Sequence, residues 1–250
     1  MTLKHSTLAA ITLSLFATAC STTPTTSASV DSDDPGMSVE QAIATPTVRA
    51  TYQPEGDAFT LVLMRVNADM HTPSHNELAE LTAGHGEFMQ SMTAEGYLLA
   101  QGPIVPPRSS GELRSMYFVD SEDPVSAYDR VCNDPAAESG LYEMEAMTFI
   151  TGSNIRAFAP MDAADAPQRR AYAAVIAPSS AAMTAMLEQM DDVVVFYGHC
   201  TSGSLEDSTL CILDASTMDE ARRVMAVVGA EAEDFQYHVW VSSAMADRMN

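Results

Sequence analysis

Basic residues are scarce in this 250-residue sequence, because only 12 lysines and arginines stand against 34 aspartates and glutamates. The formal net charge at pH 7 is therefore -22. Binding to nucleic acid or to anionic lipid head groups needs a basic surface. We expect no nucleic-acid partner, and any attachment to a membrane has to come from something other than charge.

The sequence also lacks the short motifs of several enzyme classes, namely the G-x-S-x-G nucleophile motif, the Walker phosphate loop and the dinucleotide-binding fingerprint. Zinc binding by His71, His75 and His85 is disfavoured, because Pro73 breaks the helix that would place the first two on one face. The 17 methionines fall mostly on predicted helix faces, which indicates core packing rather than copper binding. We predict no metal site and no cofactor.

Only four cysteines are present, and the most N-terminal one has a separate role described below. Cys200 and Cys211 flank the turn-like segment 202–207, symmetrically about Leu205, so a disulfide across a hairpin is geometrically feasible there. We carry that disulfide as a prediction. Cys132 falls on an apolar-faced helix with no histidine near it in sequence, which favours a buried free thiol over a nucleophile.

Residues 1–19 have the parts of a bacterial signal peptide. A lysine lies near the start, residues 8–16 form an apolar stretch too short to span a bilayer, and three small or hydroxylated residues precede Cys20. This arrangement resembles a lipobox, in which the cysteine is lipidated, and plain secretion is the alternative. Residues 20–57 are rich in Ser, Thr, Pro and Asp and predict a flexible tether. We expect a protein of the bacterial cell envelope that faces the periplasm, on the outer membrane, and contacts the membrane through its lipid only.

Residues 58–152 predict an α+β domain with the order β-α-β-β-α-β. Apolar runs and alternation indicate strands, and apolar residues three and four apart indicate helices. We expect strands at 59–66, 97–104, 113–119 and 141–150, and helices at 75–95 and 124–132. Ser74, with Glu77 three residues later, is the expected N-cap of the first helix, and Pro135 is expected to end the second. Gly102-Pro103 is expected to end the second strand or bend it at an edge, because proline has no N–H for the ladder.

A polar linker at 153–170 precedes a second pass through the same order in residues 171–243. Gly198 lies 96 positions after Gly102, and Ile212 lies 94 positions after Phe118. Such similar offsets favour an internal duplication. We expect strands at 171–177, 193–197, 210–213 and 235–241, and helices at 179–190 and 217–228.

The first half carries a motif set that resembles the YCII-related family. It has a helix histidine, His85, then Glu95-Gly96-Tyr97-Leu98-Leu99 leading to Gly102-Pro103, and later Asp134-Pro135 followed by Gly140-Leu141-Tyr142-Glu143. The resemblance implies a ferredoxin-like domain of the dimeric α+β barrel type and a His-Asp pair, here His85 and Asp134. Family members with one domain pair as homodimers, so it also implies that the two halves pack as an intramolecular pseudo-dimer and that the protein is a monomer.

A carboxylate beside an imidazole fixes its tautomer and stabilises its protonated form. On the functional interpretation, Asp134 does this for His85, and the other ring nitrogen acts as general base or acid toward a ligand in a pocket near Gly102 and Pro103. On the alternative interpretation, His85 is a core histidine satisfied by a carbonyl, and Asp134 only caps the turn before Pro135.

The second half retains no such pair, because the offsets place Ala181 and Val228 at the two positions and neither side chain can transfer a proton. His199 and His238 have no dyad partner by position and are interpreted as packing residues.

Two functions remain open from the sequence. The first is a cofactor-independent lyase, isomerase or hydrolase-like enzyme that acts on a small molecule through His85 and Asp134. The second is a non-catalytic module that binds a small molecule or a partner in the envelope. An apolar cleft beside His85 would favour the enzyme, and a filled cleft would favour the module.

Overall fold

The computed structural model of the chain describes residues 54–69, 72–108, 112–158, 169–215, 217–227 and 235–243. The chain divides into two units, Met1–Val48 and Arg49–Asn250, and every described residue belongs to the second. The predicted signal peptide, Cys20 and all but the end of the predicted tether lie outside the described residues. None of the described helices has the length and apolar character needed to cross a membrane.

The first half, residues 54–158, has the predicted order β-α-β-β-α-β with two short additions. Its elements are β1 (Asp57–Val66), α1 (His75–Ala94), β2 (Leu98–Arg108), β3 (Leu113–Val119), α2 (Pro124–Val131), α3 (Pro135–Glu138), β4 (Tyr142–Thr151) and the 3-10 helix η1 (Ile155–Phe158). The sequence patterns predict neither α3 nor η1.

The second half, residues 169–243, repeats this order with shorter helices. Its elements are β5 (Arg169–Pro178), α4 (Ala181–Leu187), β6 (Val194–Cys200), the 3-10 helix η2 (Gly203–Leu205), β7 (Ser208–Leu213), α5 (Met218–Ala226) and β8 (Gln236–Ser243). The N-cap of α5 is Thr217, whose hydroxyl accepts from the N–H of Glu220 at 3.1 Å.

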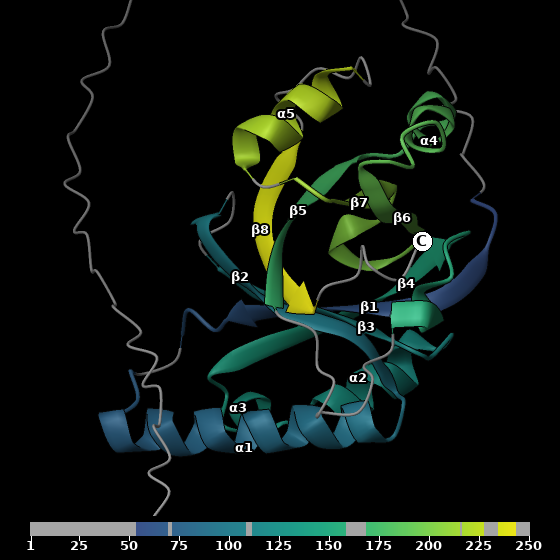
Figure 1. Ribbon diagram of the computed structural model, residues 1–250. Coiled ribbons are helices and arrows are strands. Elements are labelled where there is room, and N and C mark those ends of the chain that lie inside the picture. Colours follow the sequence, from purple (N-terminus) through teal and green to yellow (C-terminus); the bar gives the residue numbers. More distant parts are fainter. Residues whose placement is uncertain are drawn as a thin grey trace, which may run out of the picture. The chain divides into compact units, whose positions relative to one another are not determined.

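Strands of both halves form one closed barrel (Figure 1). Within the described residues the order around the barrel is β1-β3-β2-β8-β5-β7-β6-β4, and β4 pairs with β1 to close it. The first half contributes β4-β1-β3-β2 and the second half contributes the equivalent run β8-β5-β7-β6. The halves join where β2 pairs with β8 and where β4 pairs with β6. The fold is therefore mixed α+β with strands dominating, and each strand of the described barrel has a paired neighbour on both sides.

Alternation along the strands separates an inner core from two outer ones. On β1, Leu61 and Leu63 belong to the core inside the barrel, whereas Val62 and Met64 belong to the outer core of the first half. The outer core of the first half is covered by α1 and α2, through Met89, Met92, Ala127 and Val131. The outer core of the second half is covered by α4 and α5, through Met183, Leu187, Ala221 and Met225.

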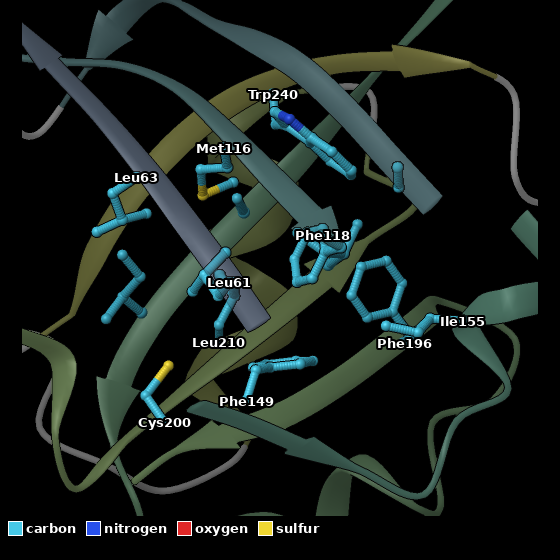
Figure 2. Packing of buried hydrophobic residues seen from close by; sticks show 14 of the residues in the cluster. Leu61, Leu63, Met116, Phe118, Phe149, Ile155, Phe196, Cys200, Leu210 and Trp240 are labelled. Carbon is cyan, nitrogen blue, oxygen red and sulfur yellow. The ribbon is translucent and has the colours of Figure 1, made fainter. Parts of the chain in front are cut away.

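Aliphatic and aromatic side chains together fill the inside of the barrel (Figure 2). The ring of Phe118 packs edge-on against Phe149, Phe196 and Trp240, with ring centroids 5.1 to 5.8 Å apart. Such contacts contribute about 0.5–1.5 kcal/mol each beyond the burial of area. Because Phe196 and Trp240 come from the second half, this cluster holds the two halves together.

The strand β2 continues past Gly102-Pro103 to Arg108, so the predicted end of the strand at this pair is wrong. Pro103 is the last residue that pairs with β3, and Ile104 is the first that pairs with β8. The proline therefore lies where the strand changes partners, at the last pair of the ladder with β3.

The predicted disulfide between Cys200 and Cys211 is also wrong, because both cysteines are free. In the hairpin of β6 and β7, Cys200 lies opposite Ser208 and Cys211 lies opposite Tyr197. The two thiols are thus offset along the strands. They also point to opposite faces, since Cys200 belongs to the inner core and Cys211 to the outer core of the second half. Cys132, expected to be a free thiol, is free and half-buried.

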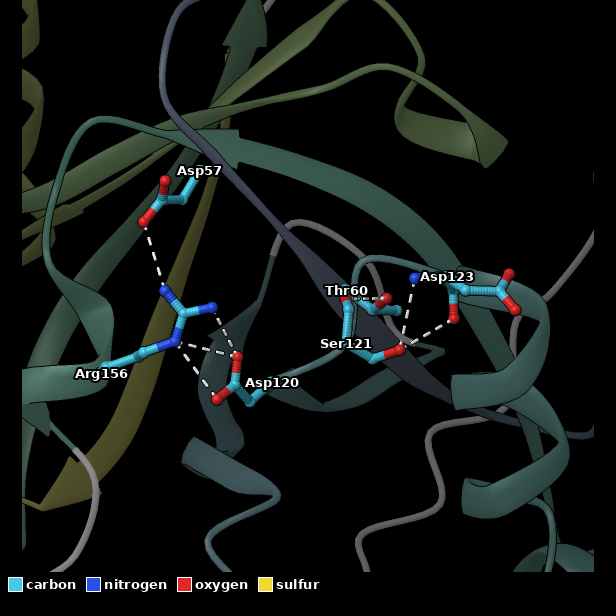
Figure 3. Close-up of polar contacts among 6 residues, drawn as sticks. All are labelled: Asp57, Thr60, Asp120, Ser121, Asp123 and Arg156. Atoms are coloured by element: carbon cyan, nitrogen blue, oxygen red, sulfur yellow. Dashed lines mark hydrogen bonds and ion pairs between the residues drawn. The ribbon is translucent and has the colours of Figure 1, made fainter.

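Arg156 of η1 forms ion pairs with Asp57 of β1 and with Asp120, which directly follows β3 (Figure 3). Its guanidinium donates to the carboxylate of Asp120 at 2.8 Å and to that of Asp57 at 3.2 Å. It also lies 4.5 Å from the centroid of the Phe59 ring. Exposed ion pairs of this kind stabilise a fold by only about 0–1 kcal/mol.

Candidate functional site

His85 lies on the face of α1 that packs against the sheet. The helix begins with a capping box, in which the Ser74 hydroxyl accepts from the N–H of Glu77 and the Glu77 carboxylate accepts from the N–H of Ser74. The buried residues Met89 and Met92 follow His85 by four and seven positions, so all three share one face. This cap and helix are as the sequence predicts, and only the last residue of the helix differs.

Asp134 lies in the turn between α2 and α3. It is the N-cap of α3, where its Oδ1 accepts from the N–H of Ala136 at 2.9 Å. Pro135 takes the first helical position, at which no N–H is needed. The Asp134 side chain is 0% exposed. Since a buried carboxylate is costly unless its oxygens are bonded, the second oxygen also needs a donor.

That donor is His85. Its Nδ1 lies 2.5 Å from Oδ2 of Asp134, across 49 positions of sequence. Gly84 permits the approach, because a Cβ at that position would lie 3.1 Å from Cγ of Pro135. The structure thus brings together the two residues that the sequence singled out. The cap of α3 and the contact with His85 are both present, so the two interpretations of Asp134 do not exclude each other.

The contact leaves one nitrogen of His85 available. With Asp134 accepting from Nδ1–H, the neutral ring carries its lone pair on Nε2. No described residue forms a hydrogen bond with Nε2, and the side chain of His85 is 25% exposed. Such a ring can take a proton at Nε2 and return it, while the carboxylate stabilises the cation formed in between. The arrangement is therefore capable of general acid–base chemistry.

A hollow of about 420 Å³ lies beside α2 and α3. Its lining residues are Asn67, Tyr128, Cys132, Ala137, Gly140, Tyr142, Glu143 and Met144. A hydrogen bond with Cys132 raises the pKa of Tyr128. Burial raises the pKa of Tyr142, and the charge of Asp134 adds to this against the opposing charge of Arg114. The hollow therefore borders the turn that carries Asp134, although neither His85 nor Asp134 lines it.

Gly102 and Pro103, predicted to flank a substrate pocket, lie in the barrel wall where β2 meets β8. The carbonyl of Gly102 accepts from Nε1–H of Trp240 at 3.0 Å and from the hydroxyl of Ser115 at 2.5 Å. A Cβ on Gly102 would collide with the carbonyl oxygen of Val241. Close approach of two strands thus accounts for this glycine. A role of either residue in a substrate pocket stays a prediction.

Two histidines of the second half have surroundings that their sequence positions do not indicate. Nδ1 of His199 lies 2.9 Å from the hydroxyl of Thr209 and 3.2 Å from that of Ser179, and burial lowers the pKa of His199 to about 4. His238 is fully buried, and neither of its ring nitrogens has a hydrogen-bond partner among the described residues. Burial, aided by the charge of Arg65, lowers the pKa of His238 to about 4. The interpretation of both as packing residues agrees with their burial. It does not distinguish His199, which has hydroxyl partners, from His238, which has no partner among the described residues.

The remaining predicted positions are less informative. Ala181 is the first residue of α4, and Val228 and His71 lie outside the described residues. His75 is the exposed first residue of α1. In the part of the chain that the structure describes, no three residues among His, Cys, Asp and Glu are grouped so as to hold a metal ion.

Comparison with known proteins adds a family for the first half. Residues 59–149 match the YCII-related domain, and no curated protein matches the chain. Among solved structures, the chain is similar to TA0507, described provisionally as a chlorite dismutase, at 11% identity and a TM-score of 0.48, over 74% of this chain and 95% of that one. It is also similar to a protein of Fusobacterium nucleatum subsp. nucleatum, described provisionally as a monooxygenase, at 7% identity and a TM-score of 0.41, over 74% and 93%. At these identities neither structure bears on function. Residues 59–149, which include both His85 and Asp134, are thus a YCII-related domain.

Proposed function

We propose that the YCII-related domain is a cofactor-independent acid–base enzyme for a small molecule, of the lyase, isomerase or hydrolase-like kind. His85 is its proton-transferring group, and Asp134 positions that ring. The observation that supports this most is the fully buried carboxylate 2.5 Å from Nδ1 of a ring that remains 25% exposed. Burying a carboxylate such as that of Asp134 costs several kcal/mol, about the usual penalty for an ion in a protein. A histidine needed only for packing would gain nothing from a partner with that cost.

The proposed step begins with the neutral ring of His85. Nδ1–H donates to Asp134, and Nε2 takes a proton from a C–H or O–H group of the bound substrate. Asp134 stays ionised throughout, held by the N–H of Ala136. The proton on Nε2 then returns to another atom of the intermediate or to its leaving group, so the ring ends as it began.

A screen followed by isotope labelling tests this proposal. Thermal-shift measurements against a panel of metabolites first identify a ligand of the wild-type protein. That ligand is then incubated with the protein in D2O, and its deuterium content and conversion are followed by mass spectrometry. We expect conversion or labelling to be about 100-fold slower in His85→Gln, the lower end of what a general base contributes.

The matched control is His75→Gln, which changes an exposed histidine on the same helix. It should behave like the wild type. A ligand that binds wild type and His85→Gln equally, and that is neither labelled nor converted by either, would contradict the enzymatic proposal.

A non-catalytic binding module is the alternative. The hollow beside α2 and α3 favours it, because its volume of about 420 Å³ suits a small molecule while neither dyad residue lines it. In that case Tyr142→Ala should abolish ligand binding, whereas His85→Gln should leave the affinity unchanged.

We also propose that residues 58–152 and 171–243 are two ferredoxin-like domains joined by the linker 153–170, and that they act as a pseudo-dimer within one monomeric chain. The repetition of one strand order in both halves supports this. Light scattering of the protein without its lipid should give the mass of a monomer. A stable dimer would count against the proposal.

The attachment to the envelope is a further proposal, supported by the apolar stretch before Cys20. Lipid on Cys20 would hold the protein at the outer membrane on its periplasmic side. Cells fed a fatty-acid analogue should label the wild type and not Cys20→Ser. Equal labelling of both would contradict lipidation at this cysteine.

A further inference from the structure

One end of the barrel gathers polar side chains that the proposed function does not use. β1 ends where the antiparallel β4 begins, and following the antiparallel pairs through β6, β7 and β5 puts the start of β8 at the same end. Arg65 is the next-to-last residue of β1, Glu145 lies near the start of β4 and His238 near the start of β8. Ser204, in the turn between β6 and β7, reaches this end as well.

Alternation along the strands shows that these side chains face the inside of the barrel. Leu63, Met147 and Trp240 all belong to the inner core. Each lies two positions from one of the polar residues, Arg65, Glu145 or His238, and residues two apart on a strand face the same side. The end of the barrel therefore carries a cation, a carboxylate and an imidazole above an apolar interior.

The imidazole of His238 lacks the hydrogen bonds that its burial calls for. The residue is 0% exposed, and neither ring nitrogen has a partner among the described residues. Leaving a buried polar group unpaired costs about 1–3 kcal/mol. Buried polar side chains in native proteins nearly always have a partner from protein, water or ligand. The partner of His238 is therefore to be sought outside the described protein atoms.

Arg65 is held only loosely at the same end. Its Nη2 lies 3.4 Å from the hydroxyl of Ser204 and 3.8 Å from Oε2 of Glu145. Glu145 is bonded more tightly to the turn, since it accepts from the Ser204 N–H at 2.6 Å and from its hydroxyl at 2.7 Å. A guanidinium has five N–H donors, and the Arg65 side chain is 26% exposed. It can thus receive an anion from solvent while Glu145 stays on the turn.

We propose that this end of the barrel is a binding site for a small organic monocarboxylate, whose oxygens accept from the Arg65 guanidinium and from a ring N–H of His238. A guanidinium matches the two oxygens of a carboxylate in a bidentate contact. The neighbouring charge of Glu145 disfavours a dianion such as phosphate. The inner-core residues Leu63 and Leu113 suit a short aliphatic chain rather than a polar one.

The protonation state of His238 fits this role. Its pKa of about 4 leaves the ring neutral at pH 7, so it carries one N–H for an acceptor and adds no charge beside Arg65. Of the two groups proposed to bind the carboxylate, Arg65 and His238, only Arg65 is then charged.

NMR titration of the ring nitrogens of His238 in the full chain, with sodium propionate as the probe, tests the site. Sodium chloride at equal ionic strength is the reference. We expect a saturable shift with propionate only. Arg65→Met should raise the half-saturating concentration about tenfold or more, since a charge-assisted bidentate contact contributes at least about 1.4 kcal/mol. Arg65→Lys should restore part of the affinity.

Two controls make the result specific. Arg156→Met removes an arginine that forms ion pairs with Asp57 and Asp120, away from this site, and it should leave the propionate midpoint unchanged. His85→Gln should also bind propionate like the wild type, so failure of the proposed acid–base function leaves this site untouched. A shift that matches that of chloride, or an unchanged midpoint in Arg65→Met, would overturn the site. Tighter binding of inorganic phosphate than of propionate would overturn its assignment to a monocarboxylate.

Discussion

The protein should lose stability as the pH falls from about 7 to about 5, because two buried histidines resist protonation in the folded state. Burial lowers the pKa of His199 to about 4, and burial with the charge of Arg65 lowers that of His238 to about 4, both from an ordinary value of 6.5. Between these values the unfolded chain binds more protons than the folded one, so stability rises with pH. The full contribution is present above about pH 6.5 and is lost progressively as the pH falls toward 4.

The size of the loss follows from this linkage. At about pH 5 each histidine holds nearly one proton in the unfolded chain and almost none in the folded one, which corresponds to a loss of about 2 kcal/mol per residue. Solvent screening at the rings lowers this to roughly 1–2 kcal/mol each. Both residues together then account for roughly 2–4 kcal/mol, which is a large share of the stability of about 5–15 kcal/mol typical of native proteins.

Urea unfolding measures this loss, with the fluorescence of Trp240 as the probe. Trp240 is the sole tryptophan of the sequence and is fully buried in the inner core, so its emission reports the opening of the barrel. We compare the free energy of unfolding at about pH 7 and about pH 5, a range in which most carboxylates stay ionised. His238→Leu, which cannot titrate, should show about half the pH-dependent loss of the wild type.

The exposed His75 supplies the control, because His75→Gln should keep the full pH dependence. An equal loss of unfolding free energy in wild type and His238→Leu would refute the assignment to His238. A loss that persists undiminished in the double variant His199→Gln and His238→Leu would refute the whole argument.

Three further changes test other parts of the structure. Asp134→Asn keeps an acceptor for the N–H of Ala136 but removes the charge facing His85, and we expect it to lower the free energy of unfolding in urea by about 1–3 kcal/mol; no change would show that the pair carries no stability. Gly102→Ala should cost about 1–3 kcal/mol in thermal unfolding, because its Cβ collides with Val241, whereas Gly152→Ala, with open space around it, should cost less. Cys200 and Cys211 should alkylate only after unfolding, since both are buried and burial raises the pKa of Cys200 to about 12; a disulfide found by mass spectrometry without reductant would contradict this.

The features that the sequence predicts correctly are those that local signals determine. The capping box of Ser74 and Glu77 marks the start of α1, and apolar spacing places His85 on its packed face. Pro135 marks the end of the preceding helix in the same way. These signals act within a few residues, so they do not depend on the rest of the fold. Local signals alone do not predict that His85 and Asp134 lie close together. That prediction also required the family resemblance and the expectation that two helices cover the same face of one sheet.

The features that the sequence misses depend on a partner that lies far away in sequence. Gly102-Pro103 looks like the end of a strand until β8, more than 130 positions later, pairs with the residues that follow it. The helix α3 is missed for a different reason, because it is only four residues long and too short to show a periodic apolar pattern. The pairing of β2 with β8 cannot be inferred from a window of neighbouring residues.

The errors in the second half have one physical cause, which is strand register. Alternation assigns residues of a single strand to two faces, but it does not say which residue of the next strand lies opposite. His199 and Cys200 are neighbours that face opposite sides, so one meets the hydroxyl of Thr209 and the other enters the inner core. A shift of register by one residue would exchange these surroundings. The same reasoning applies to His238. The pairing of β8 with β2 and β5 buries its ring at the end of the barrel that holds Arg65, where no described residue bonds to either ring nitrogen.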